Sequence, residues 1–226
     1  MAKGLFITAT GTDIGKTYVT GLIVKKLREA GISAGYYKAA LSGAELRDGE
    51  RIPGDADHVK RTAGLDDDYQ EMVSYIYDTA VSPHLAAKLE GNPAELSKVR
   101  EDFEKVCEKY DYVTAEGSGG IVCPIRWDEQ KILLEDVIRT LDLPILIVAD
   151  GALGTINSVV LTVSYAREKK IPVKGILLNR FHPGDVMEED NKSMIEQITG
   201  VPVVGVVEEN DESLSMDVSK LLELYE

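Results

Sequence analysis

Ala9-Thr10-Gly11-Thr12-Asp13-Ile14-Gly15-Lys16-Thr17 stands between an apolar, β-prone run at 5–8 and a segment with helical periodicity. In that segment apolar residues recur at the spacing of one helix face, at Val19, Leu22, Ile23 and Leu27. A strand, a glycine-containing loop, Gly-Lys-Thr and a helix follow one another in the order typical of a phosphate-binding loop. The sequence therefore predicts that this stretch binds the phosphates of a nucleotide.

The residue types of the loop suit that chemistry. Backbone N–H groups at a helix N-terminus attract anions. Lys16, which we expect to be exposed, would neutralise the β- and γ-phosphates, and the Thr17 hydroxyl would bind Mg²⁺. One departure is that Thr10 occupies the place of the usual first glycine, while Gly11 comes one residue late. The alternative is a turn that merely caps a helix, but the flanking strand and helix favour a phosphate site.

Length and composition limit the class of protein. A chain of 226 residues with 44% hydrophobic content can form one large α/β domain, and we find no internal boundary within residues 1–226. The net charge of −14 argues against nucleic acid and anionic membranes as partners. Cys107 and Cys123 do not suggest a disulfide framework or a metal cluster. Without a charged leader or an apolar run of about 20 residues, we expect a cytoplasmic protein.

Strand-like and helix-like segments alternate along the chain. The predicted strands are 4–9, 33–39, 111–115, 144–149, 173–179 and 202–207. The predicted helices are 16–30, 83–90, 95–109, 132–141, 155–169, 187–199 and 214–225. Several strands are apolar throughout, as in a parallel sheet buried on both faces. We therefore predict a doubly wound α/β fold with a mostly parallel sheet. Only 41–82 lacks a clear period, and long loops are often functional.

Ligands of such folds collect at the carboxyl ends of the strands. Lys38 and Ser42 follow the second predicted strand, although a lysine there is usually just a solvated charge. Glu116-Gly117-Ser118-Gly119-Gly120 follows the third, and its glycines would let the backbone approach a ligand closely. Asn179 and Arg180 follow the fifth. An Asn side chain suits an adenine edge, but a turn-forming role is equally compatible with the sequence.

A magnesium site needs carboxylate and hydroxyl oxygens. Thr17, Glu116 and one aspartate of Gly54-Asp55-Ala56-Asp57-His58 could supply them. Asp57 could instead cap a short helix, so the choice between Asp55 and Asp57 stays open from the residues alone.

Together these motifs identify a resemblance to the dethiobiotin synthetase family over nearly the whole chain. The resemblance depends on their order and spacing: Thr12-x-x-Gly15-Lys16-Thr17, Lys38 with Ser42-Gly43, Asp55 in Gly-Asp-Ala, Ser82-Pro83-His84-Leu85-Ala86-Ala87, Glu116-Gly117-Ser118-Gly119-Gly120 with Pro124, Gly154-Thr155-Ile156-Asn157-Ser158 and Asn179-Arg180. The family also lacks the first glycine of the loop. Three positions depart from its pattern: Gly11 replaces Asp or Asn, Ala39 replaces proline, and Glu208 stands where proline is usual, near the adenine.

The resemblance implies an ATP- and Mg²⁺-dependent ligase. It would join 7,8-diaminononanoate and CO₂ to form dethiobiotin, ADP and phosphate through a carbamate and a carbamic–phosphoric anhydride. Lys16 and Lys38 would be catalytic, and Thr17, Asp55 and Glu116 would bind the metal. The implied nucleotide contacts are Thr12, Asp13, Ile14, Gly15, Lys16, Thr17, Tyr18, Asp55, Glu116, Gly117, Ser118, Gly119, Asn179, Arg180 and Glu208. The implied substrate contacts are Thr12, Lys38, Ser42, Gly154, Thr155, Ile156 and Asn157. The last four would act across a homodimer.

Two other functions share this class of loop. A cobyrinate-type amide synthase is also an ATP-dependent ligase, but it carries a glutaminase domain for which 226 residues leave no room. A ParA/MinD-like partition ATPase carries an extra lysine early in its loop, where this chain has Thr10 and Gly11. It also often has basic or amphipathic surfaces, which a net charge of −14 disfavours.

Overall fold

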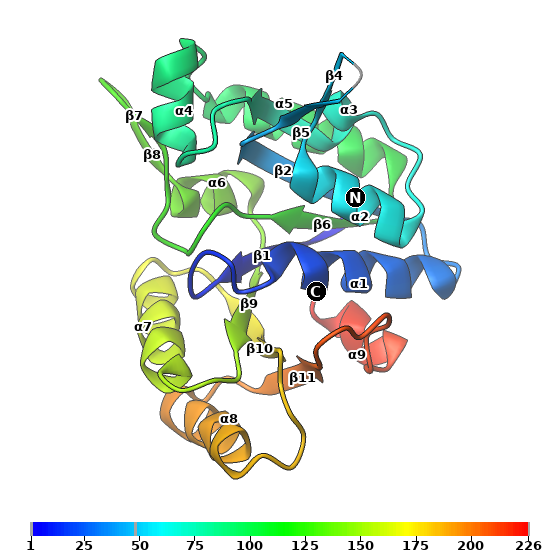
Figure 1. The fold of residues 1–226 in the computed structure, drawn as a ribbon, viewed down its shortest axis with the longest axis vertical. Helices are drawn as coiled ribbons and strands as arrows, with labels where there is room; N and C mark the ends of the chain where they lie inside the picture. The colour runs from blue at the N-terminus through cyan, green and yellow to red at the C-terminus, as the bar shows by residue number, and fades with distance from the viewer. Residues whose placement is uncertain (1, 48, 226) are drawn as a thin grey trace.

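The computed structural model describes residues 2–47 and 49–225, and within them seven strands form one parallel sheet (Figure 1). The strands are β1 (Lys3–Ala9), β2 (Ala34–Ser42), β5 (Val73–Tyr77), β6 (Tyr112–Glu116), β9 (Ile145–Asp150), β10 (Val173–Asn179) and β11 (Val203–Val207). Their order is β11-β10-β9-β1-β6-β2-β5, and every neighbouring pair is parallel. The predicted doubly wound α/β fold is confirmed.

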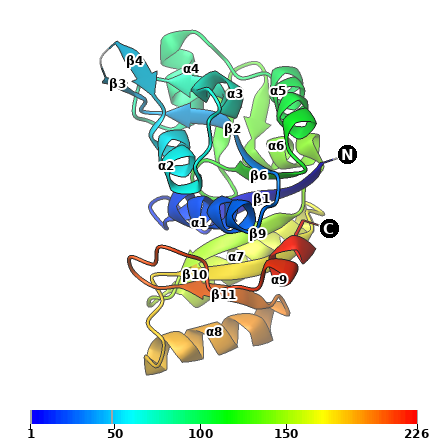
Figure 2. The ribbon, with the colours of Figure 1, turned by 90° about the vertical axis from the view of Figure 1, so that its right-hand side faces the viewer.

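Helices cover both faces of this sheet, as Figure 2 shows from the side. One face is covered by α1 (Lys16–Glu29), α2 (Gly54–Ala63) and α9 (Val218–Glu223). The other is covered by α5 (Leu96–Lys109), α6 (Leu134–Leu141), α7 (Thr155–Glu168) and α8 (Val186–Thr199). Alternation along β1 explains the two layers, because Leu5 and Ile7 pack toward α1 while Phe6 packs toward the opposite layer.

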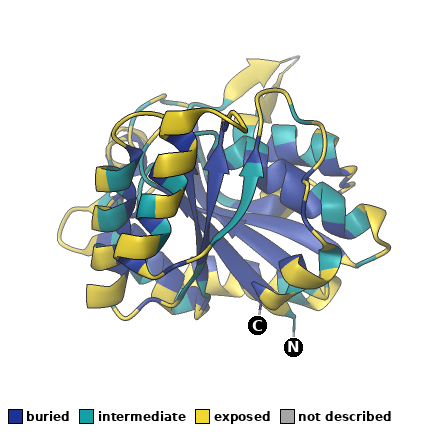
Figure 3. Ribbon diagram, turned by 90° about the horizontal axis from the view of Figure 1, so that it is seen from below, coloured by how far each residue is buried: buried dark blue, intermediate teal, exposed yellow. Residues whose placement is uncertain are grey.

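The core lies between these layers. Figure 3 shows buried strands at the centre and exposed residues on the outer faces of the helices. Strand β9 is buried at every position except Asp150, and this accounts for its continuous apolar run. None of the helices within residues 2–47 and 49–225 is long and apolar enough to cross a membrane.

The stretch 41–82 contains more regular structure than its sequence indicated. It holds the end of β2, the hairpin β3 (Glu45–Arg47) and β4 (Glu50–Ile52), helix α2, the single turn α3 (Tyr69–Met72) and the edge strand β5. These elements are short, and β5 alternates buried and half-buried residues, as an edge strand does. At this edge of the sheet Ser74 interrupts the apolar residues, so β5 has no continuous apolar run and was not predicted.

Two predicted helices begin later than expected, and a third has its expected bounds. The helix expected at 132–141 begins at Leu134, because β8 (Lys131–Leu133) first pairs with β7 (Pro124–Trp127) in a hairpin. The helix expected at 214–225 is limited to α9. Helix α4 (Pro83–Glu90) has its predicted bounds, with Pro83 in its first turn.

Candidate active site

The phosphate-binding loop joins β1 to α1 and begins the helix in an unusual backbone conformation. Gly15 precedes α1 with φ +86°, a left-handed value that favours glycine. A side chain at Gly15 would also collide with the amide of Asn179. Asp13 has φ +60°. The tight turn leaves the first N–H groups of α1 without intrahelical partners, as an anion site requires.

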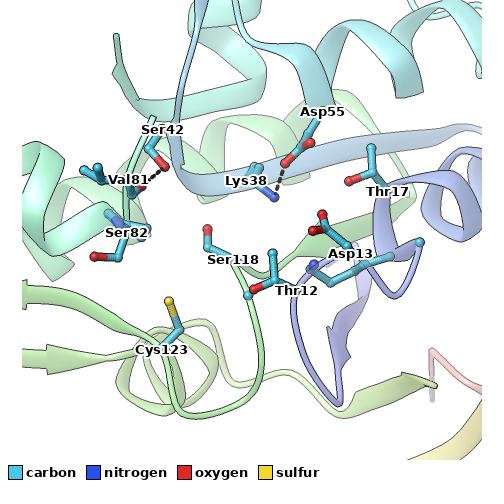
Figure 4. A pocket seen from close by; sticks show the side chains of 14 residues that line it. Thr12, Asp13, Thr17, Lys38, Ser42, Asp55, Val81, Ser82, Ser118 and Cys123 are labelled. Carbon is cyan, nitrogen blue, oxygen red and sulfur yellow. Dashed lines mark hydrogen bonds and ion pairs between the residues drawn. The ribbon is translucent and has the colours of Figure 1, made fainter. Parts of the chain in front are cut away.

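A cavity of about 430 Å³ lies over this loop (Figure 4). Five chain segments meet around it: the phosphate-binding loop, the end of β2, the start of α2, the loop after β5 and the loop after β6. Its lining consists of Thr12, Asp13, Gly15, Lys16, Thr17, Lys38, Ser42, Asp55, Val81, Ser82, Pro83, Ser118, Gly119 and Cys123. The structure thus brings together predicted residues that are more than a hundred positions apart in the sequence, such as Thr12 and Gly119.

Lys38 lies at the centre of a buried charge cluster. Its Nζ atom lies 2.8 Å from Oδ2 of Asp55 and 2.9 Å from Oε1 of Glu116, and it donates to the carbonyl of Gly117 at 2.9 Å. The Thr17 hydroxyl donates to the same Oε1 of Glu116 at 2.7 Å. The register explains the contact, because Lys38 lies directly opposite Glu116 on β2 and β6. Both side chains are almost completely buried, at 2% and 0% exposure.

The charges set the protonation of this cluster. Burial by itself would lower the pKa of Lys38, but Glu116 and Asp55 outweigh it, so the pKa is raised and the ammonium is retained. Burial would raise the pKa of Asp55, but Lys38 outweighs it and the pKa is lowered. Burial raises the pKa of Tyr36, whose hydroxyl also contacts Glu116. The cluster therefore keeps one cation against two carboxyl groups.

Lys16 differs from the prediction in its burial. Its residue is 9% exposed, because the loop and the cluster enclose it. Burial lowers the pKa of Lys16, with Glu116 acting in the opposite direction. A cation that has lost its water is well placed to attract phosphate, which supplies the missing counter-charge.

The cluster fits Mg²⁺. A hydroxyl from Thr17 and carboxylates from Asp55 and Glu116 are the hard oxygen ligands that Mg²⁺ prefers. Within the described ranges, no group of three or more His, Cys, Asp or Glu residues could hold a metal by itself. The set therefore suits an ion that also takes phosphate and water.

Asp57 takes a different place from Asp55. It lies in the first turn of α2, where Tyr69 donates to it at 2.8 Å and Arg61 lies at 2.6 Å. It does not line the cavity, and it is not the cap of the helix, which follows Pro53. Asp55 is therefore the aspartate that the geometry offers to a metal.

The remaining substrate candidates near the cavity are held by backbone carbonyls. The hydroxyl of Ser42 donates to Val81, and that of Ser118 donates to Ala40 at 2.7 Å. Sequence reasoning assigned no role to Val81, Ser82, Pro83 or Cys123, which also line the cavity. The hallmark Ser82-Pro83 was visible in the sequence, whereas Cys123 offered no signal beyond its place after the glycines.

Asn179 and Arg180 contact the loop rather than the cavity. Asn179 donates to the carbonyl of Ile14 at 2.9 Å, and Arg180 donates to that of Asp13 at 2.8 Å. The nucleotide contacts of Asn179 and Arg180 stay a prediction, and so does the nucleotide contact of Glu208. The backbone N–H of Glu208 donates to the side chain of Asp211. The Tyr18 hydroxyl donates to the carbonyl of this same Asp211.

The segment 154–157 lies apart from the cavity of its own chain. Gly154, with φ +94°, precedes α7, and Asn157 lines a separate hollow together with Thr10, Gly120 and Leu161. The Thr155 hydroxyl is buried and has no hydrogen-bond partner among residues 2–47 and 49–225. The substrate role predicted for residues 154–157 across a dimer stays a prediction.

A parallel α/β sheet with a Gly-Lys-Thr loop at the end of its first strand, beside a buried charge cluster, defines a phosphate-binding-loop protein. Solved structures share this fold. They include the MinD cell division protein of Aquifex aeolicus (TM-score 0.54, 15% identity, 99% of this chain and 86% of that one) and a ParA family ATPase of Chlorobium tepidum (TM-score 0.55, 14% identity, 100% and 89%). At these identities the likeness concerns the fold alone.

Sequence comparison identifies the family. A family model described as an AAA domain matches residues 3–216. An ATP-dependent dethiobiotin synthetase of Brachyspira hyodysenteriae is 53% identical over 228 residues, covering 100% of both chains. One from Clostridium botulinum, strain Okra, is 52% identical over 226 residues, covering 100% of this chain and 99% of the relative. The chain belongs to the ATP-dependent dethiobiotin synthetase family and is an ATP-dependent ligase.

Proposed function

We propose that the chain converts 7,8-diaminononanoate, CO₂ and ATP into dethiobiotin, ADP and phosphate, with Mg²⁺ as cofactor. The observation that carries the proposal is the position of Lys38, buried between Asp55 and Glu116 in the cavity that the phosphate-binding loop also lines. A second fixed cation beside Lys16 suits a reaction in which two anions, a carbamate and a γ-phosphate, must approach each other.

The proposed reaction has three steps. One amine of the substrate attacks the carbon of CO₂ and loses a proton, which gives a carbamate. A carbamate oxygen attacks the γ-phosphorus, the bond to the β–γ bridging oxygen breaks, and ADP leaves with a carbamic–phosphoric anhydride formed. The second amine then attacks the carbamoyl carbon, the bond from that carbon to the phosphate oxygen breaks, and phosphate and a proton leave. No covalent enzyme intermediate is needed, so positioning and charge neutralisation dominate.

Each group of the site has a task in this scheme. Lys16 neutralises the β- and γ-phosphates, and Lys38 holds the carbamate beside them. Thr17, Asp55 and Glu116 would hold Mg²⁺, which supplies further neutralisation of phosphate charge. The Ser42 and Ser118 hydroxyls and the backbone of Gly117 and Gly119 would orient the substrate and the phosphates.

A phosphate-release assay tests the reaction directly. We expect ATP hydrolysis to depend on both diaminononanoate and bicarbonate, with one phosphate released for each dethiobiotin formed. Phosphate release that needs neither compound would instead indicate a partition-type ATPase. A requirement for glutamine would indicate an amide synthase.

The dimer proposal follows from the segment that one chain leaves outside its own cavity. We propose that residues 154–157 of one protomer bind the substrate carboxylate of its partner, because this segment begins α7 and a helix N-terminus attracts anions. Mixing Lys16→Ala with a variant carrying Ile156→Pro tests this, since some mixed dimers would keep one intact site. Activity should partly return. Absence of recovery in heterodimers shown to form would mean that each chain holds a complete site.

A further inference from the structure

The hydroxyl of Tyr36 is buried beside the charge cluster, and the reaction proposed above gives it no role. Tyr36 is 2% exposed, and its hydroxyl donates to Oε2 of Glu116 at 3.1 Å. The other oxygen, Oε1, accepts hydrogen bonds from Thr17 and Lys38, which both line the cavity. The two oxygens of Glu116 therefore have separate partners. Oε1 bonds to the two side chains that line the cavity, and Oε2 bonds to Tyr36.

The ring of Tyr36 cannot easily move away from this contact. It belongs to a buried apolar cluster with Val24 of α1 and Val59 of α2. Tyr36 and Lys38 lie two positions apart on β2 and so share one face of the strand. The register of β2 with β6 then sets both side chains beside Glu116. Close packing fixes the ring, and the fixed ring aims the hydroxyl.

We propose that Tyr36 is a positioning residue, whose hydroxyl holds Oε2 of Glu116 so that Oε1 stays directed at the metal and phosphate site. Thr17 and Lys38 have further partners in the proposed reaction, namely the metal and the carbamate. Tyr36 has none, so its hydrogen bond is the one that can persist on Glu116 throughout a catalytic cycle. The inference rests on the proposed assignment of Glu116 as a ligand of Mg²⁺.

Binding of Mn²⁺ by Tyr36→Phe, measured by electron paramagnetic resonance with a non-hydrolysable ATP analogue, tests the proposal. We expect Mn²⁺ affinity to fall about threefold to tenfold, the range that the loss of one ordinary hydrogen bond gives. Binding of the analogue without metal should not change. In turnover, the Mg²⁺ concentration for half-maximal activity should rise by the same factor, while kcat at saturating Mg²⁺ should recover toward that of the unmodified protein.

Tyr37→Phe is the matched control. Tyr37 is equally buried but lies on the opposite face of β2, where its hydroxyl contacts Ser74 and the carbonyl of Val99. It should lose stability without losing Mn²⁺ affinity. Unchanged Mn²⁺ binding in Tyr36→Phe, equal weakening in both variants, or a fall in kcat at every Mg²⁺ concentration would overturn the inference.

Glu116→Gln separates the inference from the function on which it rests. If Glu116→Gln weakens Mn²⁺ binding and Tyr36→Phe does not, only the role of Tyr36 fails. If Glu116→Gln itself leaves Mn²⁺ binding unchanged, the assignment of Glu116 as a metal ligand fails, and the role of Tyr36 fails with it.

Discussion

Strands β6 and β2 lie on one side of β1 in the parallel sheet and β9 and β10 lie on the other, but the polar side chains of the two pairs have different partners. At the first pair, Lys38 from the middle of β2 and Glu116 from the end of β6 bond to each other, and Lys38 lines the cavity. At the second pair, Asn179 and Arg180 donate to the backbone of the phosphate-binding loop, and Arg180 also contacts Asp150 at 3.3 Å.

The comparison shows that a polar residue at a strand end does not by itself define a catalytic group. Lys38 is buried and lines the cavity, and the buried Glu116 bonds to it, so the charge of this pair acts on whatever enters the cavity. Asn179 and Arg180 donate hydrogen bonds to the carbonyls of Ile14 and Asp13, so they stabilise the conformation of the phosphate-binding loop. We therefore expect substitutions in the first region to change chemistry, and substitutions in the second to change nucleotide affinity or stability.

The largest effect is expected for Lys16→Ala. Loss of the cation that faces the phosphates should reduce turnover by about a thousandfold or more, while the fold persists. Steady-state phosphate release and thermal melting measure the two quantities. Lys25→Ala, which removes a lysine from the outer part of the same helix, is the control and should remain active. Near-normal turnover in a folded Lys16→Ala protein would contradict the assignment of the loop.

Lys38→Gln should act on the chemical step. Because the ammonium is proposed to hold the carbamate, we expect kcat to fall by about a hundredfold and the KM for ATP to change much less. Initial rates over a range of ATP concentrations give both constants. A loss confined to the KM for ATP would make Lys38 a plain nucleotide-binding residue.

Asp55 and Asp57 form a matched pair on one helix. Asp55→Ala should raise the Mg²⁺ concentration for half-maximal activity by about tenfold to a hundredfold or more. Removing a group that only orients a metal ligand already has an effect of about this size. Asp57→Ala should instead lower the melting temperature, because it removes the partner of Tyr69 and Arg61. Titration of activity with Mg²⁺ distinguishes them. If Asp57→Ala loses activity and Asp55→Ala keeps it, then Asp57 is the metal ligand and the two assignments must be exchanged.

Asn179→Ala tests the second region. The variant removes one hydrogen bond to the carbonyl of Ile14, a loss of about 1 kcal/mol that corresponds to about fivefold in affinity. We expect weaker ATP binding by calorimetry with kcat little changed. A fall in kcat comparable with that of Lys38→Gln would erase the difference between the two regions.

The smallest effect is expected at His182, which follows β10. The hydrogen bond that the ring of His182 makes to the carboxylate of Glu188, together with the charge of that carboxylate, raises the pKa of His182 above the ordinary value. The stability that this pair contributes is fully present below about pH 6.5 and is lost as pH rises through the higher folded-state pKa. The melting temperature of His182→Gln should therefore fall below that of the unmodified protein mainly in acid. A difference that grows toward alkaline pH would contradict this sign.

The sequence was sufficient for the features that depend on neighbours along the chain. The apolar run before the loop, Gly15-Lys16-Thr17 and the helical spacing after it identified β1, the phosphate site and α1, because each pattern is local. Continuous apolar segments likewise predicted the central strands. Strand β5 was not predicted because it lies at the edge of the sheet and lacks a continuous apolar run, and it is identified by its pairing with β2.

Contacts between distant segments were decided only by the tertiary structure. Nothing in the sequence places Lys38 opposite Glu116, since that contact follows from the register of two strands 78 positions apart. The residues alone left Asp55 and Asp57 as alternatives, and the side of α2 that faces the cavity favours Asp55, in line with the family resemblance. The burial of Lys16 and the contact of Tyr36 with Glu116 arise in the same way. The sequence directly gives the residue types and the local periodicity of apolar residues. Strand register and packing set the distances on which charge interactions and hydrogen bonds depend.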